Sequence, residues 1–160
     1  MARNRQPVLK KCRALGIDPV VLGVNKSSKR GPRPNANKKP TEYAVQLREK
    51  QKAKFIYNVM EKQFRKIYEE AARKLGVTGL TLIEYLERRL ENVVYRLGFA
   101  KTRRQARQVV SHGHVAVNGR RVNIASYRVK VGDVISIIER TMKYIGAHVS
   151  ASGGVEFAPI

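Results

Sequence analysis

The sequence predicts an α+β protein with a basic extended N-terminal tail, a helical part after it and then a small antiparallel sheet. From residue 41 to residue 97, apolar side chains recur at steps near 3.6, the period of an amphipathic helix. Beyond residue 113, short apolar runs alternate with turn residues, among them Asn118-Gly119, which is typical of a β-hairpin. A chain of 160 residues has room for one ordinary domain or two small ones.

Residues 1–41 are predicted to be an extended basic tail, largely disordered on its own. They hold eleven Lys and Arg against one acid, and prolines interrupt them. The part from 26 to 40 has almost no apolar side chain, so burial cannot offset the entropy of ordering it. The tail could be a solubilising leader. The clustered charges favour a segment that folds against phosphates, with contacts from Lys29, Arg30, Arg33, Lys38 and Lys39.

Residues 42–81 are predicted to form a helical subdomain around one long amphipathic helix. This helix should run from a cap at Thr41 to Gly76, with a basic face opposite its apolar face. The stretch 48–54 is the least balanced by acids. It can be ordinary surface charge, but its place beside the basic tail favours contact with a polyanion through Arg48, Lys50, Lys52 and Lys54.

Residues 82–140 are predicted to hold two helices and a small sheet. The first helix should run from Leu82 to Leu97, after a capping box made by Thr81 and Glu84, and Gly98 should end it. A second, short helix should follow at a sharp angle, as in a helix-turn-helix.

Thr102 is the expected N-cap of that short helix, and Gln105 can return a bond to the cap backbone. The hairpin around Asn118-Gly119 comes next, because a type I′ turn needs positive φ at both central residues. Residues 129–131 and 134–138 should add a strand, a turn and a strand that cover the helix pair.

The short helix and the hairpin form the main candidate for a binding surface. Residues three and four apart share a helix face, so Ala106, Val109 and Val110 fall on one side and the arginines on the other. The return strand opens with two more arginines. These elements predict a compact cationic surface that contains Arg103, Arg104, Arg107, Arg120 and Arg121.

His112 and His114 form an H-x-H pair beside these arginines. The pair could suggest a metal, but two ligands do not make a structural zinc site, and no Cys, Asp or Glu lies near in sequence. We favour rings that hydrogen-bond a phosphate or stack on a base, which would make binding mildly sensitive to pH.

The charge of the chain predicts a polyanionic partner. Thirty-three Lys and Arg against twelve Asp and Glu give a net charge of +21, and nucleic acid is the commonest partner of such a field. Cys12 is the only cysteine, which excludes a disulfide framework or a four-cysteine zinc site within the chain. No run approaches a membrane span, and a cytoplasmic location is expected.

The motifs of the common enzyme classes are absent from the sequence. There is no Walker loop, no G-x-G-x-x-G and no G-x-S-x-G, and Asp is present only at positions 18 and 133. We therefore expect no catalysis, no cofactor and no metal.

Residues 96–123, RLGFAKTRRQARQVVSHGHVAVNGRRVN, resemble the RNA-binding module named after bacterial small-subunit ribosomal protein four. This module also occurs in some pseudouridine synthases, tyrosyl-tRNA synthetases and a heat-shock RNA binder. The stretches 42–54 (EYAVQLREKQKAK), 61–66 (EKQFRK) and 68–71 (YEEA) are more specific, because they resemble the ribosomal protein family itself. The resemblance covers essentially the whole chain.

The resemblance implies a structural protein of the small ribosomal subunit. Such a protein binds a helical junction in the 5′ domain of the ribosomal RNA, nucleates subunit assembly and contributes to translational accuracy. It contacts small-subunit protein five and other ribosomal proteins and lies near the messenger RNA entry channel. Mapped onto this sequence, the RNA-binding surface comprises Arg103, Arg104, Arg107, His112, His114, Asn118, Arg120 and Arg121, and we add Lys101 and Arg89.

Three departures from the family pattern stand out. Some members carry a four-cysteine zinc site near the N-terminus, and with Cys12 alone this site is not carried over. Ala125 stands where the pattern usually has Pro, which changes a loop. Family members continue past the equivalent of Ile160, so segment 141–160 is expected to be a truncated C-terminal part.

Two other functions remain open at this point. An accessory RNA-binding subunit of an RNA-modifying enzyme would show turnover on ribosomal RNA. A nucleoid-type DNA binder would bind duplex DNA and folded RNA equally well.

Overall fold

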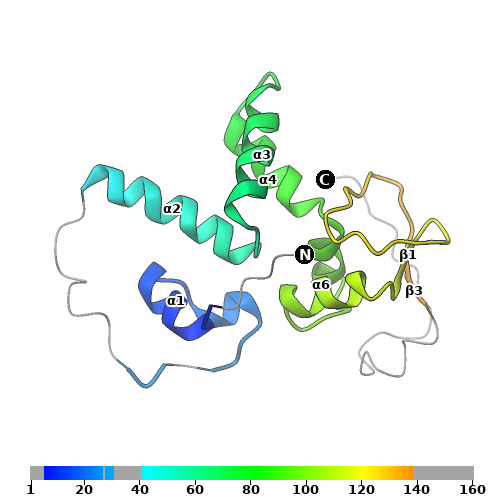
Figure 1. Ribbon diagram of the computed structural model, residues 1–160, viewed down its shortest axis with the longest axis horizontal. Coiled ribbons are helices and arrows are strands. Elements are labelled where there is room, and N and C mark those ends of the chain that lie inside the picture. The colour runs from blue at the N-terminus through cyan, green and yellow to red at the C-terminus, as the bar shows by residue number, and fades with distance from the viewer. Residues whose placement is uncertain (1–5, 27, 31–40, 139–160) are drawn as a thin grey trace. The chain divides into compact units, whose positions relative to one another are not determined.

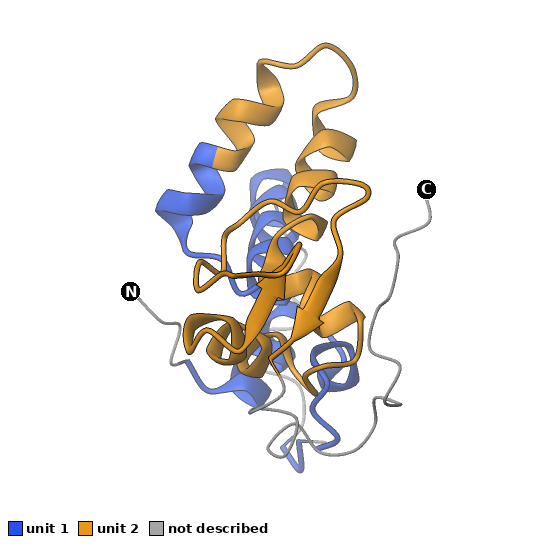
Figure 2. Ribbon diagram, turned by 90° about the vertical axis from the view of Figure 1, so that its right-hand side faces the viewer, with its two compact units in different colours: residues 1–66 blue, residues 67–160 orange. Residues whose placement is uncertain are grey.

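The computed structural model describes residues 6–26, 28–30 and 41–138, which form two compact units (Figures 1 and 2). The first unit is Met1–Lys66 and the second is Ile67–Ile160. The elements in chain order are α1 (Val8–Leu15), the 3₁₀ helix η1 (Pro19–Leu22), α2 (Glu42–Ile56), α3 (Glu61–Ala72), α4 (Thr78–Glu87), α5 (Leu90–Arg96), α6 (Arg103–Ser111), β1 (Val115–Val117), β2 (Arg120–Arg121) and β3 (Ile135–Ile137). The predicted α+β class is confirmed.

Residues 8–15 and 19–22 are helical, so the prediction of a disordered tail is wrong for this part. Cys12 and Leu15 of α1 are buried with Phe55 of α2, and three partly buried side chains pack around them: Val8, Ile17 and Leu22. Pro7 and Pro19 stand at the starts of α1 and η1, where proline is tolerated because the first N–H groups of a helix have no internal partner.

The predicted long helix is two helices, α2 and α3. Asn58 lies between them with φ of +53°, a left-handed conformation that an α-helix cannot contain. The N–H of Asn58 donates to the carbonyl of Phe55, and the N–H of Val59 donates to that of Lys54. This pair of bonds is the Schellman motif that ends many helices, with Asn in the usual place of Gly. Residue 58 therefore ends α2 well before the expected stop at Gly76.

The next predicted helix is also divided, into α4 and α5. Thr81 is not its cap: α4 begins at Thr78, and the Thr81 hydroxyl donates back to the carbonyl of Val77. At the start of α5, the N–H groups of Leu90 and Glu91 donate to the carbonyls of Tyr127 and Ala125. A distant segment thus satisfies the amides that a side-chain cap would otherwise serve.

That distant segment is the one predicted to contain a strand at 129–131, and the prediction is wrong. Its backbone pairs with the α4–α5 junction through the N–H of Val129, which donates to the carbonyl of Arg88, and through a single bridge between Arg89 and Arg128. Gly132, with φ of +90°, turns the chain into β3 as expected. The backbone groups of this segment are bonded to the α4–α5 junction, which explains why they do not extend the sheet.

The sheet has the order β2-β1-β3, with both pairs antiparallel. Val117 pairs with Arg120 across Asn118-Gly119, whose φ values of +51° and +75° confirm the predicted type I′ turn. The core of the second unit joins this sheet to α5 and α6, and its buried side chains include Leu90, Val93, Val94, Phe99, Ala106, Val109, Val110, Val115, Val117, Val129 and Ile135.

Candidate nucleic-acid interface

The start of α6 is fixed by side-chain caps. The Thr102 hydroxyl accepts a hydrogen bond from the N–H of Gln105 at 3.2 Å, as predicted. The side-chain oxygen Oε1 of Gln105 accepts from the N–H of Lys101 at 2.9 Å, so the return bond goes one residue before the expected cap. Ala106 and Val110 are fully buried, which anchors the opposite face of α6 in the core.

Arg103 and Arg107 do not lie on an exposed cationic face, contrary to prediction. They are only 7% and 8% exposed. The Arg107 guanidinium binds both carboxylate oxygens of Glu91 on α5. Arg103 donates from Nε to Oδ1 of Asn92 at 2.7 Å, and its guanidinium lies 4.4 Å from the ring centroid of Tyr95. A buried carboxylate is very costly without a cation, which explains why Arg107 is buried on Glu91. Arg103 is buried against a neutral amide and an aromatic ring of the same helix, α5.

Arg89 is the third arginine that the structure removes from the predicted surface. It is 6% exposed, and its Nε and Nη2 donate to Oε1 of Glu91 at 2.9 and 2.7 Å. Glu91, itself 2% exposed, therefore lies between two guanidinium groups. Glu91 was missed by sequence reasoning, although an acid inside the apolar run from Leu90 to Val94 was a signal that buried cations were needed.

The other predicted residues of this module remain accessible. Lys101, His112, Arg120 and Arg121 are exposed, and Arg104 and His114 are partly exposed. Arg104 belongs to α6, the two histidines follow its C-terminus, and the two arginines form β2. The cationic surface thus has fewer arginines than predicted, but α6 and the hairpin hold those that remain on rigid backbone.

Three of the predicted residues meet at the end of α6. The Arg121 guanidinium donates from Nη2 to the carbonyl of His112 at 3.1 Å. The rings of His112 and His114 are 5.8 Å apart between centroids and meet edge to face at 63°. The structure therefore groups one arginine and two imidazoles at a single corner of the second unit.

Asn118 is exposed, but its amide is engaged within the fold. Nδ2 donates to Oδ1 of Asp133, and Oδ1 accepts from the N–H of Val134, both at 2.9 Å. The other oxygen of Asp133 accepts from the N–H of Lys130 at 2.8 Å. The Lys130 backbone bond, followed by the Asn118 bond, holds the pKa of Asp133 below its usual value. Asn118 therefore joins the hairpin turn to the turn before β3.

The basic stretch of α2 is more balanced than its sequence indicated. Glu61 of α3 binds both Lys50 and Lys54, each at 2.5 Å, and these bonds lower the pKa of the Glu61 carboxyl group. Lys52 pairs with Glu49 at 2.7 Å, and Arg48 is exposed.

The predicted contacts of the N-terminal segment are only partly described by the structure. Lys29 and Arg30 are exposed. Arg33, Lys38 and Lys39 lie outside the described residues.

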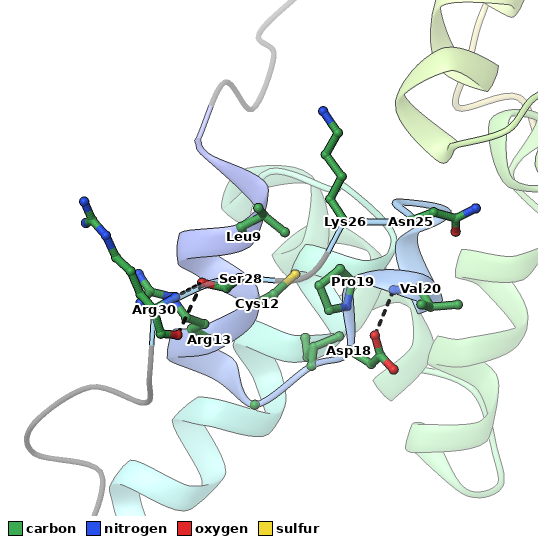
Figure 3. A pocket seen from close by; sticks show the side chains of 12 residues that line it. Leu9, Cys12, Arg13, Asp18, Pro19, Val20, Asn25, Lys26, Ser28 and Arg30 are labelled. Atoms are coloured by element: carbon green, nitrogen blue, oxygen red, sulfur yellow. Dashed lines mark hydrogen bonds between the residues drawn. The ribbon is translucent and has the colours of Figure 1, made fainter.

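A pocket of about 700 Å³ lies in the first unit around Cys12 (Figure 3). Apolar side chains form much of its lining, and its polar groups are used locally: Asp18 accepts from the N–H of Val20, and Ser28 from that of Arg30. The side chains of Lys26 and Arg30 extend away from the apolar residues in Figure 3.

Comparison with known proteins defines the class of this chain. Residues 88–135 match the S4 domain, and residues 3–87 match the N-terminal domain of ribosomal proteins S4/S9. The S4 domain match covers α5, α6, β1 and β2 and ends at the first residue of β3. The chain is therefore an S4-domain protein of the ribosomal type.

Curated relatives identify the family. Small ribosomal subunit protein uS4 of Fusobacterium nucleatum subsp. nucleatum is 90% identical over 141 residues, which are 88% of this chain and 72% of the relative. The uS4 proteins of Lachnospira eligens (60% over 141 residues, 88% and 71%) and Gloeobacter violaceus (50% over 155 residues, 91% and 75%) are also similar. The chain belongs to the uS4 family, and it is a structural ribosomal protein rather than an enzyme.

Two further findings concern only the described residues. None of their helices is both long and apolar enough to cross a membrane. No group of three or more His, Cys, Asp and Glu side chains among them could hold a metal ion.

Proposed function

We propose that this protein binds small-subunit ribosomal RNA through accessible basic side chains on α6, beside its two ends and on the hairpin. The surface consists of Lys101, Arg104, His112, His114, Arg120 and Arg121, and we call it the α6–hairpin face. The observation that carries the proposal is that some arginines of this unit are buried and stabilise the fold, whereas others remain accessible. Arg89, Arg103 and Arg107 are buried on Glu91 and Asn92, and two of them, Arg103 and Arg107, hold α6 to α5. The other arginines keep exposed surface on the rigid elements so fixed.

Binding by this face would combine two physical effects. Its cations neutralise phosphates and release counterions, which supplies affinity for any RNA. The fixed spacing of α6 and the hairpin then favours RNA whose backbone presents phosphates in a matching arrangement, because proteins recognise folded RNA mostly by shape and backbone contacts. Phosphate contacts of this kind set the position of the protein on the RNA.

The finer parts of the function rest on the resemblance to the family. On that basis the RNA site is a helical junction in the 5′ domain, and binding there nucleates subunit assembly and contributes to translational accuracy. The protein partners are small-subunit protein five and other ribosomal proteins, with messenger RNA nearby at the entry channel. The net charge of +21 supports a location surrounded by RNA.

A double charge reversal tests the α6–hairpin face. Arg104→Glu with Arg120→Glu should weaken binding to a transcript of the 5′ domain by roughly 10-fold or more, since one charge-assisted hydrogen bond contributes about 1.5–3 kcal/mol. Filter binding measures the affinity, and circular dichroism checks that the fold is kept. Arg107 is left intact, because its reversal would disrupt the bond to buried Glu91.

The matched control is Lys66→Glu with Arg73→Glu, which changes the net charge equally. Both control residues are exposed, at α3 and just beyond its end. Equal weakening by the two double variants would mean that only total charge matters, and would reject the α6–hairpin face as the RNA site.

A further inference from the structure

Gly113 lies directly against the guanidinium group of Arg121, in addition to having the left-handed backbone conformation that favours glycine. It follows the last turn of α6 with φ of +70°, between His112 and His114. A Cβ atom at this position would lie 2.3 Å from Nε, 2.5 Å from Nη2 and 2.8 Å from Cζ of Arg121. The Arg121 guanidinium therefore occupies the space that any other residue at position 113 would fill.

The same guanidinium is held from a second side. Its Nη2 donates to the carbonyl of His112, the C-cap residue of α6. The C-terminus of a helix carries partial negative charge and carbonyls without internal partners, so a cation is favoured there. Arg121 is exposed, yet its guanidinium group is held in one position by contact with Gly113 and the C-terminal end of α6.

Gly98 shows what conformation alone requires. It follows the C-cap of α5 just as Gly113 follows that of α6, and its φ is +79°. A Cβ atom at Gly98 would meet nothing within 4 Å. The two glycines share the left-handed conformation, and only Gly113 has the additional role of leaving room for an arginine.

We propose that Gly113 is a positioning residue for RNA binding. It seats the Arg121 guanidinium beside the exposed His112, so that one phosphodiester group of the RNA can accept hydrogen bonds from both. A guanidinium has five N–H donors, and the bond to His112 uses one of them. This inference rests on the proposed function, and it identifies a residue that itself need not touch RNA.

The test compares Gly113→Ala with Gly98→Ala. Both variants place a Cβ at positive φ, so both should lower Tm by a similar amount, about 2–8 °C. The clash at position 113 is with the far end of a flexible side chain, which can move without disturbing the fold. Gly113→Ala should weaken binding to the 5′-domain transcript roughly 10-fold, while Gly98→Ala should leave it unchanged.

The salt dependence of RNA affinity distinguishes the loss of one positioned phosphate contact from a general loss of folded structure. Loss of one phosphate contact reduces the slope of log affinity against log salt by about 0.7–0.9. We expect that reduction in Gly113→Ala and not in Gly98→Ala. Equal effects of the two variants on affinity and slope would overturn the inference.

Arg121→Gln completes the experiment as a double-mutant cycle. If Gly113 acts through Arg121, adding Gly113→Ala to Arg121→Gln should cause no further loss of affinity. Additive losses would contradict the inference, and so would full affinity in Arg121→Gln. Failure of the unaltered protein to bind the transcript would instead reject the proposed function, so the two failures are distinguishable.

Discussion

Glu91 determines what the neighbouring arginines do. In sequence, Arg103, Arg104 and Arg107 are equivalent cations on one polar helix face. In the structure, Arg107 is buried on Glu91 and Arg103 on Asn92, while Arg104 keeps partial exposure. For Arg107 the difference follows from the cost of burying the Glu91 carboxylate, which is offset only when hydrogen-bonded cations surround it. For Arg103 it follows from the Asn92 amide and the Tyr95 ring on the same helix.

Removing the charge of Glu91 should strongly destabilise the protein. Glu91→Gln preserves the shape of the side chain but leaves two buried guanidinium groups without a counter-charge. We expect a loss of about 3–5 kcal/mol in the free energy of unfolding. Urea unfolding followed by circular dichroism measures this loss.

Glu84→Gln is the control for that experiment. Glu84 pairs with Arg88 at 2.8 Å; Glu84 is exposed and Arg88 partly exposed, so removing the charge of Glu84 should cost less than about 1 kcal/mol. Similar unfolding midpoints for the two variants would show that the buried pairs contribute little.

At the scale of elements, backbone bonding sets where helices α2 and α5 end or begin, and apolar periodicity does not. The apolar pattern continues through residue 58, but the left-handed Asn58 ends α2 there. Between α4 and α5, the backbone of segment 125–129 supplies the acceptors that the first amides of α5 need. In both places, one regular pattern in sequence covers two elements in space.

The conformation of Asn58 yields a prediction for the α2–α3 junction. Asn58→Gly and Asn58→Ala both remove the amide, but only alanine has a Cβ that opposes positive φ. Asn58→Ala should therefore be less stable than Asn58→Gly by about 1–2 kcal/mol, as measured by urea unfolding. Equal stability would mean that the left-handed turn is not required at this position.

At the scale of the whole molecule, charge should govern affinity. Lys101, Arg104, Arg120 and Arg121 carry four positive charges on the α6–hairpin face at neutral pH. At about 0.7–0.9 per neutralised phosphate, they alone give a slope near −3 for log affinity against log salt. Exposed cations elsewhere, such as Arg48 and Lys29, should make it steeper. Filter binding from 50 to 200 mM salt would contradict this if the slope were near −1.

Local patterns in the sequence were sufficient for several features. The α+β class, the Thr102 cap, the turn at Asn118-Gly119 and the uS4 family all followed from residues close together in the chain. Caps and two-residue turns depend on bonds within a few residues, so their signals are present in short stretches.

The long-range features required the folded chain. Nothing near Arg107 in sequence indicates that Glu91, sixteen positions away, would bury it, and nothing near Gly113 indicates that Arg121 would lie on it. Glu61 likewise neutralises Lys50 across the turn between α2 and α3. Periodicity assigns a side chain to a face of its own helix. Whether that face meets water or a buried charge depends on which element packs against it, and this was settled by tertiary contacts.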